Sequence, residues 1–276
     1  MVLNRREPGF LRQMVQEVHR ELEKGVYEVP DLRVEPPPGA GRLASALLAG
    51  GSPGLIVELK HTSPGYREGK LPALGPERFL EVARAGGAEA VSVIPQAFRF
   101  GGSLKEFARV ARQSPLPVLF KDFVLDPRQV RAAGRLGARA VLLLARLERE
   151  GGLTSPLAEL AREARRNGLE VVAEVHQEAD LPAALALRPD LLGVNARDLE
   201  TLELDRDRAL RTLAAARGHG VPLVGMSGIT GPEEVSAYHR SGADAVLVGT
   251  RFLEAEDPAR FLRSLRPLRR PERERS

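Results

Sequence analysis

The chain has 276 residues, of which 43% are hydrophobic and 28% charged, proportions typical of a soluble globular protein. It has no cysteine, which excludes disulfides, thiolate nucleophiles and cysteine metal sites. The formal net charge of +4 gives a mildly positive field, and such a field favours an anionic small-molecule substrate.

Several classes of protein are not expected from this composition. No apolar run reaches the ~20 residues of a membrane helix, and the N-terminus lacks the apolar core of a signal peptide, so we expect a cytoplasmic protein. The five histidines do not fall at metal-ligand spacings, so we expect no metal. Aromatic residues make up 4% of the chain, too few for a surface that stacks on bases, so we expect no nucleic-acid partner.

Residues 1–50 are predicted to form a helical extension. One helical stripe carries Phe10, Leu11, Met14, Val15, Val18 and Leu22. Pro36-Pro37-Pro38-Gly39 makes a stiff break, and residues 42–49 can form a second short helix. The apolar stripe must cover part of the domain that follows, either its floor or the mouth of its active site.

Eight short apolar runs then recur, separated by amphipathic segments of helical length. The runs are Leu55–Leu59, Ala90–Ile94, Val118–Phe120, Ala140–Leu144, Val171–Val175, Leu191–Val194, Leu223–Gly225 and Ala245–Val248. Runs rich in valine, isoleucine and leucine are typical of parallel strands that are buried on both faces. Their alternation with helices predicts a parallel sheet.

The starts of the helices are marked by proline after glycine, aspartate or serine, at Pro76, Pro127, Pro156, Pro232 and Pro258. A Gly-Ala-x-Ala-Val pattern precedes the second, fourth and eighth strands, at residues 87–91, 137–141 and 242–246. No dinucleotide fingerprint follows the first strand. We therefore predict a (βα)8 TIM barrel over residues 51–266 and a basic tail over residues 267–276.

Barrel enzymes assemble their sites at the C-terminal ends of the strands. In this sequence most residues at these positions are polar or glycine. The candidates are Glu58, Lys60, Ser63, Lys121, Glu174, Asn195, Arg197, Ser227, Gly228, Gly249 and Thr250. Two of only five lysines stand there, and lysine, unlike arginine, can exchange its proton when desolvated. We expect burial near other cations to lower the pKa of Lys121.

Two features at the strand ends each allow a simpler reading. Glu58 and Lys60 are two residues apart, so they project to the same side of their strand. They can be catalytic partners or only a structural ion pair. The glycines after strands seven and eight can bring backbone N–H groups to a phosphate, or can simply form tight turns.

Six segments, at residues 58–65, 98–103, 117–123, 172–176, 193–199 and 227–229, resemble in order the motifs of the indole-3-glycerol-phosphate synthase family. The specific part is Glu-x-Lys-x-x-Ser-Pro followed at a distance by Lys-Asp-Phe. Three positions depart from the usual family pattern. His61 stands where arginine is common, Ala196 replaces the second asparagine of Asn-Asn-Arg, and Met226 replaces a glutamate.

This resemblance implies a carboxy-lyase of tryptophan biosynthesis, without a cofactor, acting on 1-(2-carboxyphenylamino)-1-deoxy-D-ribulose 5-phosphate. Lys121 would be the general acid for ring closure and Glu174 the acid/base for dehydration. Glu58 and Lys60 would handle the substrate's carboxylate and hydroxyl protons. Ser63, Asn195, Arg197 and Ser227 would orient the substrate, and Asn195 is also counted among the catalytic residues. Phe123 would contact the aromatic ring. The phosphate would be bound by Gly228, Gly249 and Thr250.

Three other functions remain open on the sequence. A phosphoribosyl-type isomerase of the same fold typically uses a cysteine, which this chain lacks. A Schiff-base aldolase could use Lys121 or Lys60. A noncatalytic barrel could bind a phosphate ligand without turnover. We expect a monomer, although the sequence does not exclude an oligomer.

Overall fold

The computed structural model describes residues 9–50, 53–64, 71–72 and 74–266. Eight parallel strands form a closed barrel in which each strand pairs with the next and the last pairs with the first. The strands are β1 (Gly54–Leu59), β2 (Ala90–Val93), β3 (Val118–Phe120), β4 (Ala140–Leu144), β5 (Glu170–Val175), β6 (Leu191–Asn195), β7 (Leu223–Met226) and β8 (Ala245–Val248). The predicted (βα)8 barrel is confirmed.

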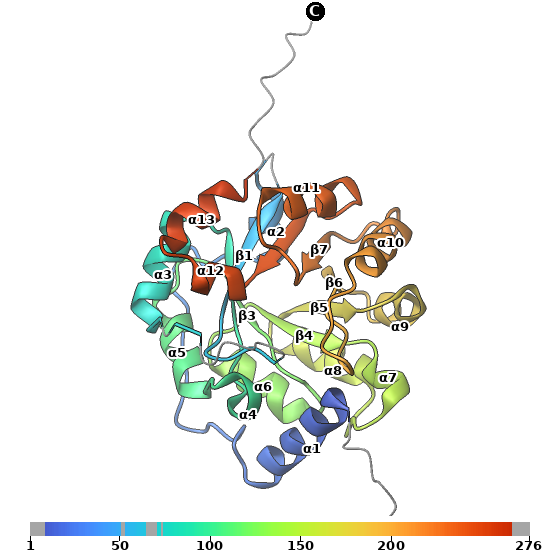
Figure 1. The fold of residues 1–276 in the computed structure, drawn as a ribbon. Helices are drawn as coiled ribbons and strands as arrows, with labels where there is room; N and C mark the ends of the chain where they lie inside the picture. Colours follow the sequence, from blue (N-terminus) through green and yellow to red (C-terminus); the bar gives the residue numbers. More distant parts are fainter. Residues whose placement is uncertain (1–8, 51–52, 65–70, 73, 267–276) are drawn as a thin grey trace, which may run out of the picture.

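The helices surround the strands in a ring (Figure 1). They are α1 (Phe10–Glu23), α2 (Leu43–Leu48), α3 (Pro76–Ala85), α4 (Ala97–Phe100), α5 (Leu104–Gln113), α6 (Pro127–Arg135), α7 (Leu147–Glu150), α8 (Leu157–Arg166), α9 (Leu181–Ala186), α10 (Arg206–Ala216), α11 (Pro232–Arg240), α12 (Thr250–Glu254) and α13 (Pro258–Ser264), with the 3-10 turn η1 (Glu178–Asp180). Within the described part of the chain, no helix is both long enough and apolar enough to cross a membrane.

The local signals for helix starts are correct with one exception. At α6, Asp126 caps the backbone N–H of Arg128, and Gln129 completes a capping box. Pro156, however, is not the first residue of α8 but its cap, with an extended ψ of 145°. The carboxylate of Glu148 accepts a hydrogen bond from the backbone N–H of Leu157, at 3.3 Å, so a side chain from the preceding helix, α7, caps α8.

Helices α1 and α2 lie at opposite ends of the barrel. The backbone N–H of Leu11 in α1 bonds to the carbonyl of Leu199, which follows the C-terminal end of β6. Figure 1 shows α1, in dark blue, beside α6 and α7. In α2, the N–H groups of Leu43 and Ala44 donate to the carboxylate of Glu170, the first residue of β5. Thus α1 borders the mouth of the barrel, whereas α2 closes its floor. The tail proposed for residues 267–276 lies outside the described residues.

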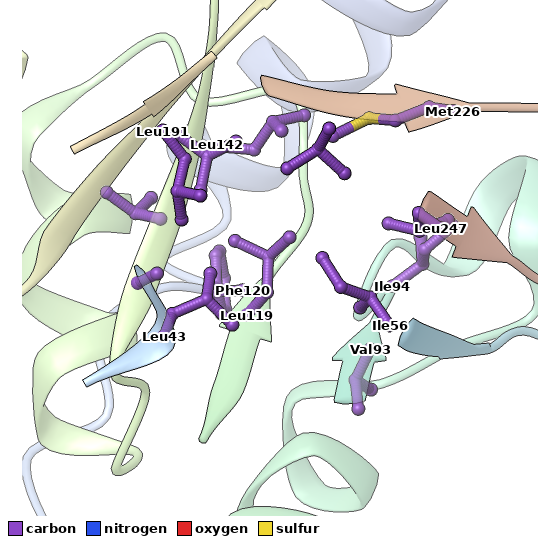
Figure 2. Packing of buried hydrophobic residues seen from close by; sticks show 14 of the residues in the cluster. Leu43, Ile56, Val93, Ile94, Leu119, Phe120, Leu142, Leu191, Met226 and Leu247 are labelled. Atoms are coloured by element: carbon purple, nitrogen blue, oxygen red, sulfur yellow. The ribbon is translucent and has the colours of Figure 1, made fainter. Parts of the chain in front are cut away.

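The interior of the barrel is filled by apolar side chains from several strands. Figure 2 shows Ile56, Leu142, Met226 and Leu247 projecting from β1, β4, β7 and β8 into this interior. Met226 lies against Gly193 of β6, where a Cβ would collide with its thioether. This packed layer forms the base of the cleft described next.

Candidate active site

One buried carboxylate holds both of the strand-end lysines. Glu58, near the end of β1, is 2% exposed. Its Oε1 lies 2.8 Å from Nζ of Lys60, and its Oε2 lies 3.3 Å from Nζ of Lys121, which directly follows β3. A carboxylate between two ammonium groups fixes both of them relative to each other, so three side chains from two strand ends form one rigid unit.

The electrostatics of this unit follow from burial and from the charges within it. Burial would raise the pKa of Glu58, but the charges of Lys121 and Lys60 outweigh it and lower that pKa to about 2. Burial would likewise lower the pKa of Lys121, but the charges of Glu58 and Glu174 outweigh it and raise that pKa. The expectation of a lowered Lys121 pKa is therefore wrong, because the charges of Glu58 and Glu174 outweigh both burial and the charge of Arg197.

Glu174 forms the second charged centre of the site. It lies near the end of β5, is 2% exposed, and accepts a hydrogen bond of 3.1 Å from Nδ2 of Asn195. Nε2 of His176 lies 3.2 Å from the same oxygen. Burial would raise the pKa of Glu174, but the contact with His176 and the charge of Lys121 lower it. The free site thus holds two ionised carboxylates and two ammonium groups.

These groups line a cleft at the C-terminal ends of the strands. The structure brings nine of the predicted residues to its wall: Glu58, Lys60, Ser63, Lys121, Phe123, Glu174, Asn195, Arg197 and Ser227. Asn195 also accepts a hydrogen bond from the backbone N–H of Arg197, and the Arg197 guanidinium donates to the carbonyl of Leu202, at 2.7 Å. The loop after β6 is therefore held by its own polar side chains.

A second pocket adjoins this cleft and shares Glu58, Lys60 and Ser227 with it. Gly228, Gly249 and Thr250, the other three predicted residues, line this pocket. Ser227 and Gly228 both have positive φ angles, 67° and 69°, a conformation that costs energy for serine and is often found at functional sites. Thr250 begins α12, so backbone N–H groups border the pocket.

Glycine at position 249 has a specific structural reason. A Cβ placed there would lie 2.9 Å from Oε1 of Glu58 and 3.2 Å from Nζ of Lys60. Any larger residue would therefore press on the charged pair, so this glycine lets β8 approach β1 closely where the two pockets meet.

An aromatic wall was missed by the sequence analysis except for Phe123. Phe10 of α1 packs against Phe123 and Phe100, with ring centroids 6.1 and 6.4 Å away, and all three line the cleft. The signals were present, since Phe10 belongs to the apolar stripe and Phe100 to the segment at residues 98–103. Periodicity shows which face of a helix is apolar but not that the face borders a ligand pocket.

Within the described ranges, no three histidine, aspartate or glutamate side chains are grouped as metal ligands would be. The cleft therefore offers cations on lysine, carboxylates, an apolar wall and a backbone-lined pocket. Such a site can bind an elongated anion with an aromatic part and can exchange protons with it.

Comparisons with known proteins agree with this geometry. The family model described as indole-3-glycerol phosphate synthase matches residues 11–265. The indole-3-glycerol phosphate synthase of Methanopyrus kandleri is 37% identical over 254 residues, covering 90% of this chain and 96% of its own. That of a Parafrankia species is 39% identical, covering 88% of this chain and 85% of its own.

Among solved structures, a thiamine phosphate pyrophosphorylase from Pyrococcus furiosus is similar at a TM-score of 0.56 and 18% identity. It covers 81% of this chain and 96% of its own, and at this identity the similarity supports the fold alone. The family match and the relatives go further, because they extend over nearly the whole chain. The chain belongs to the indole-3-glycerol phosphate synthase family.

Proposed function

We propose that the protein is an indole-3-glycerol-phosphate synthase acting on 1-(2-carboxyphenylamino)-1-deoxy-D-ribulose 5-phosphate. The observation that carries this proposal is the placement of Glu58, Lys60, Lys121 and Glu174 in one cleft that continues into a glycine-lined pocket. The substrate has a phosphate, an aromatic carboxylate and a ketone, and the cleft has a complementary group for each.

Binding requires the two ends of the substrate to be held apart. The phosphate is bound by backbone N–H groups around Gly228, Gly249 and Thr250, where the barrel fold commonly places phosphates. The aromatic ring lies against Phe123 and its neighbours Phe10 and Phe100. Ser63, Arg197 and Ser227 orient the chain between them. The ketone then faces Lys121.

Ring closure forms a bond between the aromatic carbon that bears the carboxylate and the carbonyl carbon of the ketone. The carbonyl oxygen gains negative charge as the bond forms, and Lys121 protonates it. Because the pKa of Lys121 is raised, this side chain carries its proton at neutral pH. Lys60, fixed by Glu58, binds the substrate carboxylate, whose loss as carbon dioxide restores the aromatic ring.

Dehydration then removes the hydroxyl group as water and a proton from the adjacent carbon. Glu174 is ionised in the free site because its pKa is lowered, so it begins as the base, with Asn195 holding its carboxylate. The ammonium groups beside Glu58 supply the acid. A Schiff-base reaction is less suited to this site, since it needs a neutral lysine and the raised pKa of Lys121 opposes that form.

The test is to incubate the purified protein with the carboxyphenylamino-deoxyribulose phosphate and to follow indole absorbance and fluorescence. Turnover without added cofactor or metal supports the proposal. Binding without turnover would favour a noncatalytic barrel, and borohydride trapping of a covalent adduct would favour an aldolase. The family role also leads us to propose a cytoplasmic protein that works as a monomer, which gel filtration with light scattering tests.

A further inference from the structure

A chain of hydrogen-bonded polar side chains, buried except for the half-buried Glu21, connects α1 to the segment that carries Lys121. Asp122 follows Lys121 directly and is 3% exposed. Its Oδ1 accepts a hydrogen bond of 2.8 Å from its neighbour, the N–H of Phe123, and its Oδ2 accepts one of 2.7 Å from the hydroxyl of Tyr27. Tyr27, 5% exposed, lies in the loop that follows α1. The chain therefore ends one residue from the proposed general acid.

The same hydroxyl faces a second carboxylate. Oε2 of Glu21, on α1, lies 3.1 Å from the Tyr27 oxygen, and Oε1 of Glu21 accepts a hydrogen bond of 3.2 Å from Gln96. A phenol has one hydrogen and cannot donate it to two carboxylates at once. Both contacts are satisfied when Tyr27 donates to Asp122 and a protonated Glu21 donates to the Tyr27 oxygen. The geometry thus calls for one additional proton.

The charged groups around these hydrogen-bonded side chains do not neutralise the two carboxylates in place of that proton. In the part of the chain that the structure describes, neither Glu21 nor Asp122 forms an ion pair with lysine or arginine. The nearby charged groups do not neutralise Glu21. Glu17 pairs with Arg20, and its charge also raises the pKa of Glu21. Arg128 pairs with Asp126 and the carbonyl of Leu22, and Arg99 with the side chain of Gln13.

The pKa shifts of Glu21, Asp122 and Tyr27 agree with the additional proton that the hydrogen bonds require. Burial first, and then the charge of Asp122, raise the pKa of Glu21 from 4.5 to about 7. Burial also raises the pKa of Asp122, and burial together with Asp122 raises that of Tyr27, so the phenol keeps its hydrogen. The additional proton is therefore held up to about neutral pH and lost above it.

On the side away from α1, the segment that follows β3 is held by Gln129 of α6. Gln129 donates to the carbonyl of Phe123, at 2.9 Å, and accepts from the N–H groups of Leu125 and Asp126. Gln129 also donates to Oδ2 of Asp122, at 3.4 Å, and the same oxygen accepts the shorter hydrogen bond from Tyr27 on the α1 side. Phe10 of α1 also packs on Phe123, so a displacement of α1 moves the aromatic wall as well.

We infer that Glu21 and Tyr27 are positioning residues for the reaction, which hold Asp122 and thereby fix Lys121 and Phe123 in the cleft. This inference rests on the proposed function. Neither residue lines the cleft, so their effect passes through Asp122. Ionisation of Glu21 places a second anion beside Asp122 and breaks the chain, so positioning weakens as the pH rises above about 7.

The experiment compares wild type with Tyr27→Phe, Glu21→Gln and the control Glu17→Gln, one turn away on α1. Tyr27→Phe removes the shorter of the two hydrogen bonds to Oδ2 of Asp122 and leaves the 3.4 Å one from Gln129. We expect kcat to fall ~10-fold with a smaller change in KM, since misplacement of a catalytic group is costly. Glutamine at position 21 can still donate to Tyr27 and accept from Gln96. We expect near wild-type kcat at pH 6.5, and kcat that persists to pH 9 while that of wild type and Glu17→Gln declines.

Two results would overturn the inference: a Tyr27→Phe enzyme with kcat within twofold of wild type, or identical pH profiles for Glu21→Gln and wild type between pH 6 and 9. If Tyr27→Phe does not fold, the Glu21→Gln profile decides alone. Absence of turnover in the wild type would refute the proposed function instead. In that case, melting temperatures decide. The melting temperature of Glu21→Gln, relative to that of wild type, must rise between pH 6 and 8.5. A constant difference would contradict the additional proton in the hydrogen-bonded chain of Glu21, Tyr27 and Asp122.

Discussion

Lys121 is the side chain on which the proposed ring closure depends most directly. Replacing it with methionine keeps the length and the apolar stem but removes the proton. We expect kcat to fall by ~100-fold or more, the typical effect of losing a general acid. Steady-state fluorescence of the indole product measures the change, and circular dichroism checks that the barrel remains folded.

Lys121→Arg is the informative companion variant. A guanidinium keeps the charge next to Glu58 but holds its proton too tightly to donate it, so we expect little rescue of kcat. If the arginine variant retained near wild-type turnover, Lys121 would act as an electrostatic clamp. The role of proton donor would then move to Lys60 or Glu174.

Met226 occupies a position where family members usually carry a glutamate. Here the side chain is 1% exposed and packs against Gly193 beneath the cleft, and a thioether cannot exchange protons. Met226→Leu conserves volume, so it should cost less than ~1.5 kcal/mol of stability and leave most of kcat. A 100-fold loss of kcat in a folded variant would show that the thioether contributes to the site in a way that packing does not explain.

The sequence predicted which side chains stand at the strand ends but not their electrostatics. Glu58, Lys60, Lys121 and Glu174 could be identified because each stands within or just after the end of an apolar run, which is a local signal. The sign of the Lys121 pKa shift was wrong, because it depends on a carboxylate 3.3 Å away across two strands. The pairing of Tyr27 with Asp122, 95 residues apart, has no local signal at all.

At the level of helices and strands, the local signals were nearly sufficient. The ends of β3, β4 and β8 agree with the apolar runs, because a strand covered on both faces is apolar throughout. The cap of α8 was misassigned because a side chain of the preceding helix, α7, accepts from its first N–H group. The stripe of α1 was visible, but periodicity gives the apolar face of a helix and not the end of the barrel that it covers.

The contact between β8 and β1 predicts the effect of a change at Gly249. Alanine there would put its Cβ 2.9 Å from Oε1 of Glu58, so the charged pair must shift as well as the phosphate pocket. We expect kcat/KM to fall by ~100-fold, with kcat reduced and KM raised, since small displacements of catalytic groups are costly.

Gly75→Ala is the matched control for Gly249→Ala. Gly75 also immediately precedes a helix and has a negative φ, but among the described residues the nearest atom to a Cβ there would be Oε2 of Glu77, at 3.9 Å. Its kinetic constants should stay near those of wild type. Inorganic phosphate should compete with the substrate in wild type and more weakly in Gly249→Ala. An effect of Gly249→Ala on KM alone would mean that the charged pair does not move.

Across the protein, carboxylates with shifted pKa values affect stability in two opposite directions as the pH changes. Glu58 and Asp126 have pKa values lowered to about 2, so the stability that they contribute is present above their ordinary pKa values, 4.5 and 3.8, and is lost as the pH falls toward 2. Glu21 has a raised pKa, so its contribution is present below 4.5 and is lost as the pH rises through about 7. The two trends together favour maximal stability in mildly acidic solution.

Glu58→Gln tests the acid side of this balance. At pH 7 the variant leaves Lys60 and Lys121 without their shared carboxylate, and breaking such a buried pair typically costs ~3–5 kcal/mol. The wild type loses the same interaction when Glu58 is protonated, so the difference in unfolding free energy should shrink as the pH falls from 4.5 toward 2. Urea unfolding at a series of pH values measures it. Glu81→Gln, in an exposed pair with Arg78, should stay within ~1 kcal/mol of wild type throughout. A difference in unfolding free energy between Glu58→Gln and wild type that stayed constant with pH would mean that the lysines do not hold Glu58 ionised. Packing of the side chain, rather than its charge, would then stabilise this end of the barrel.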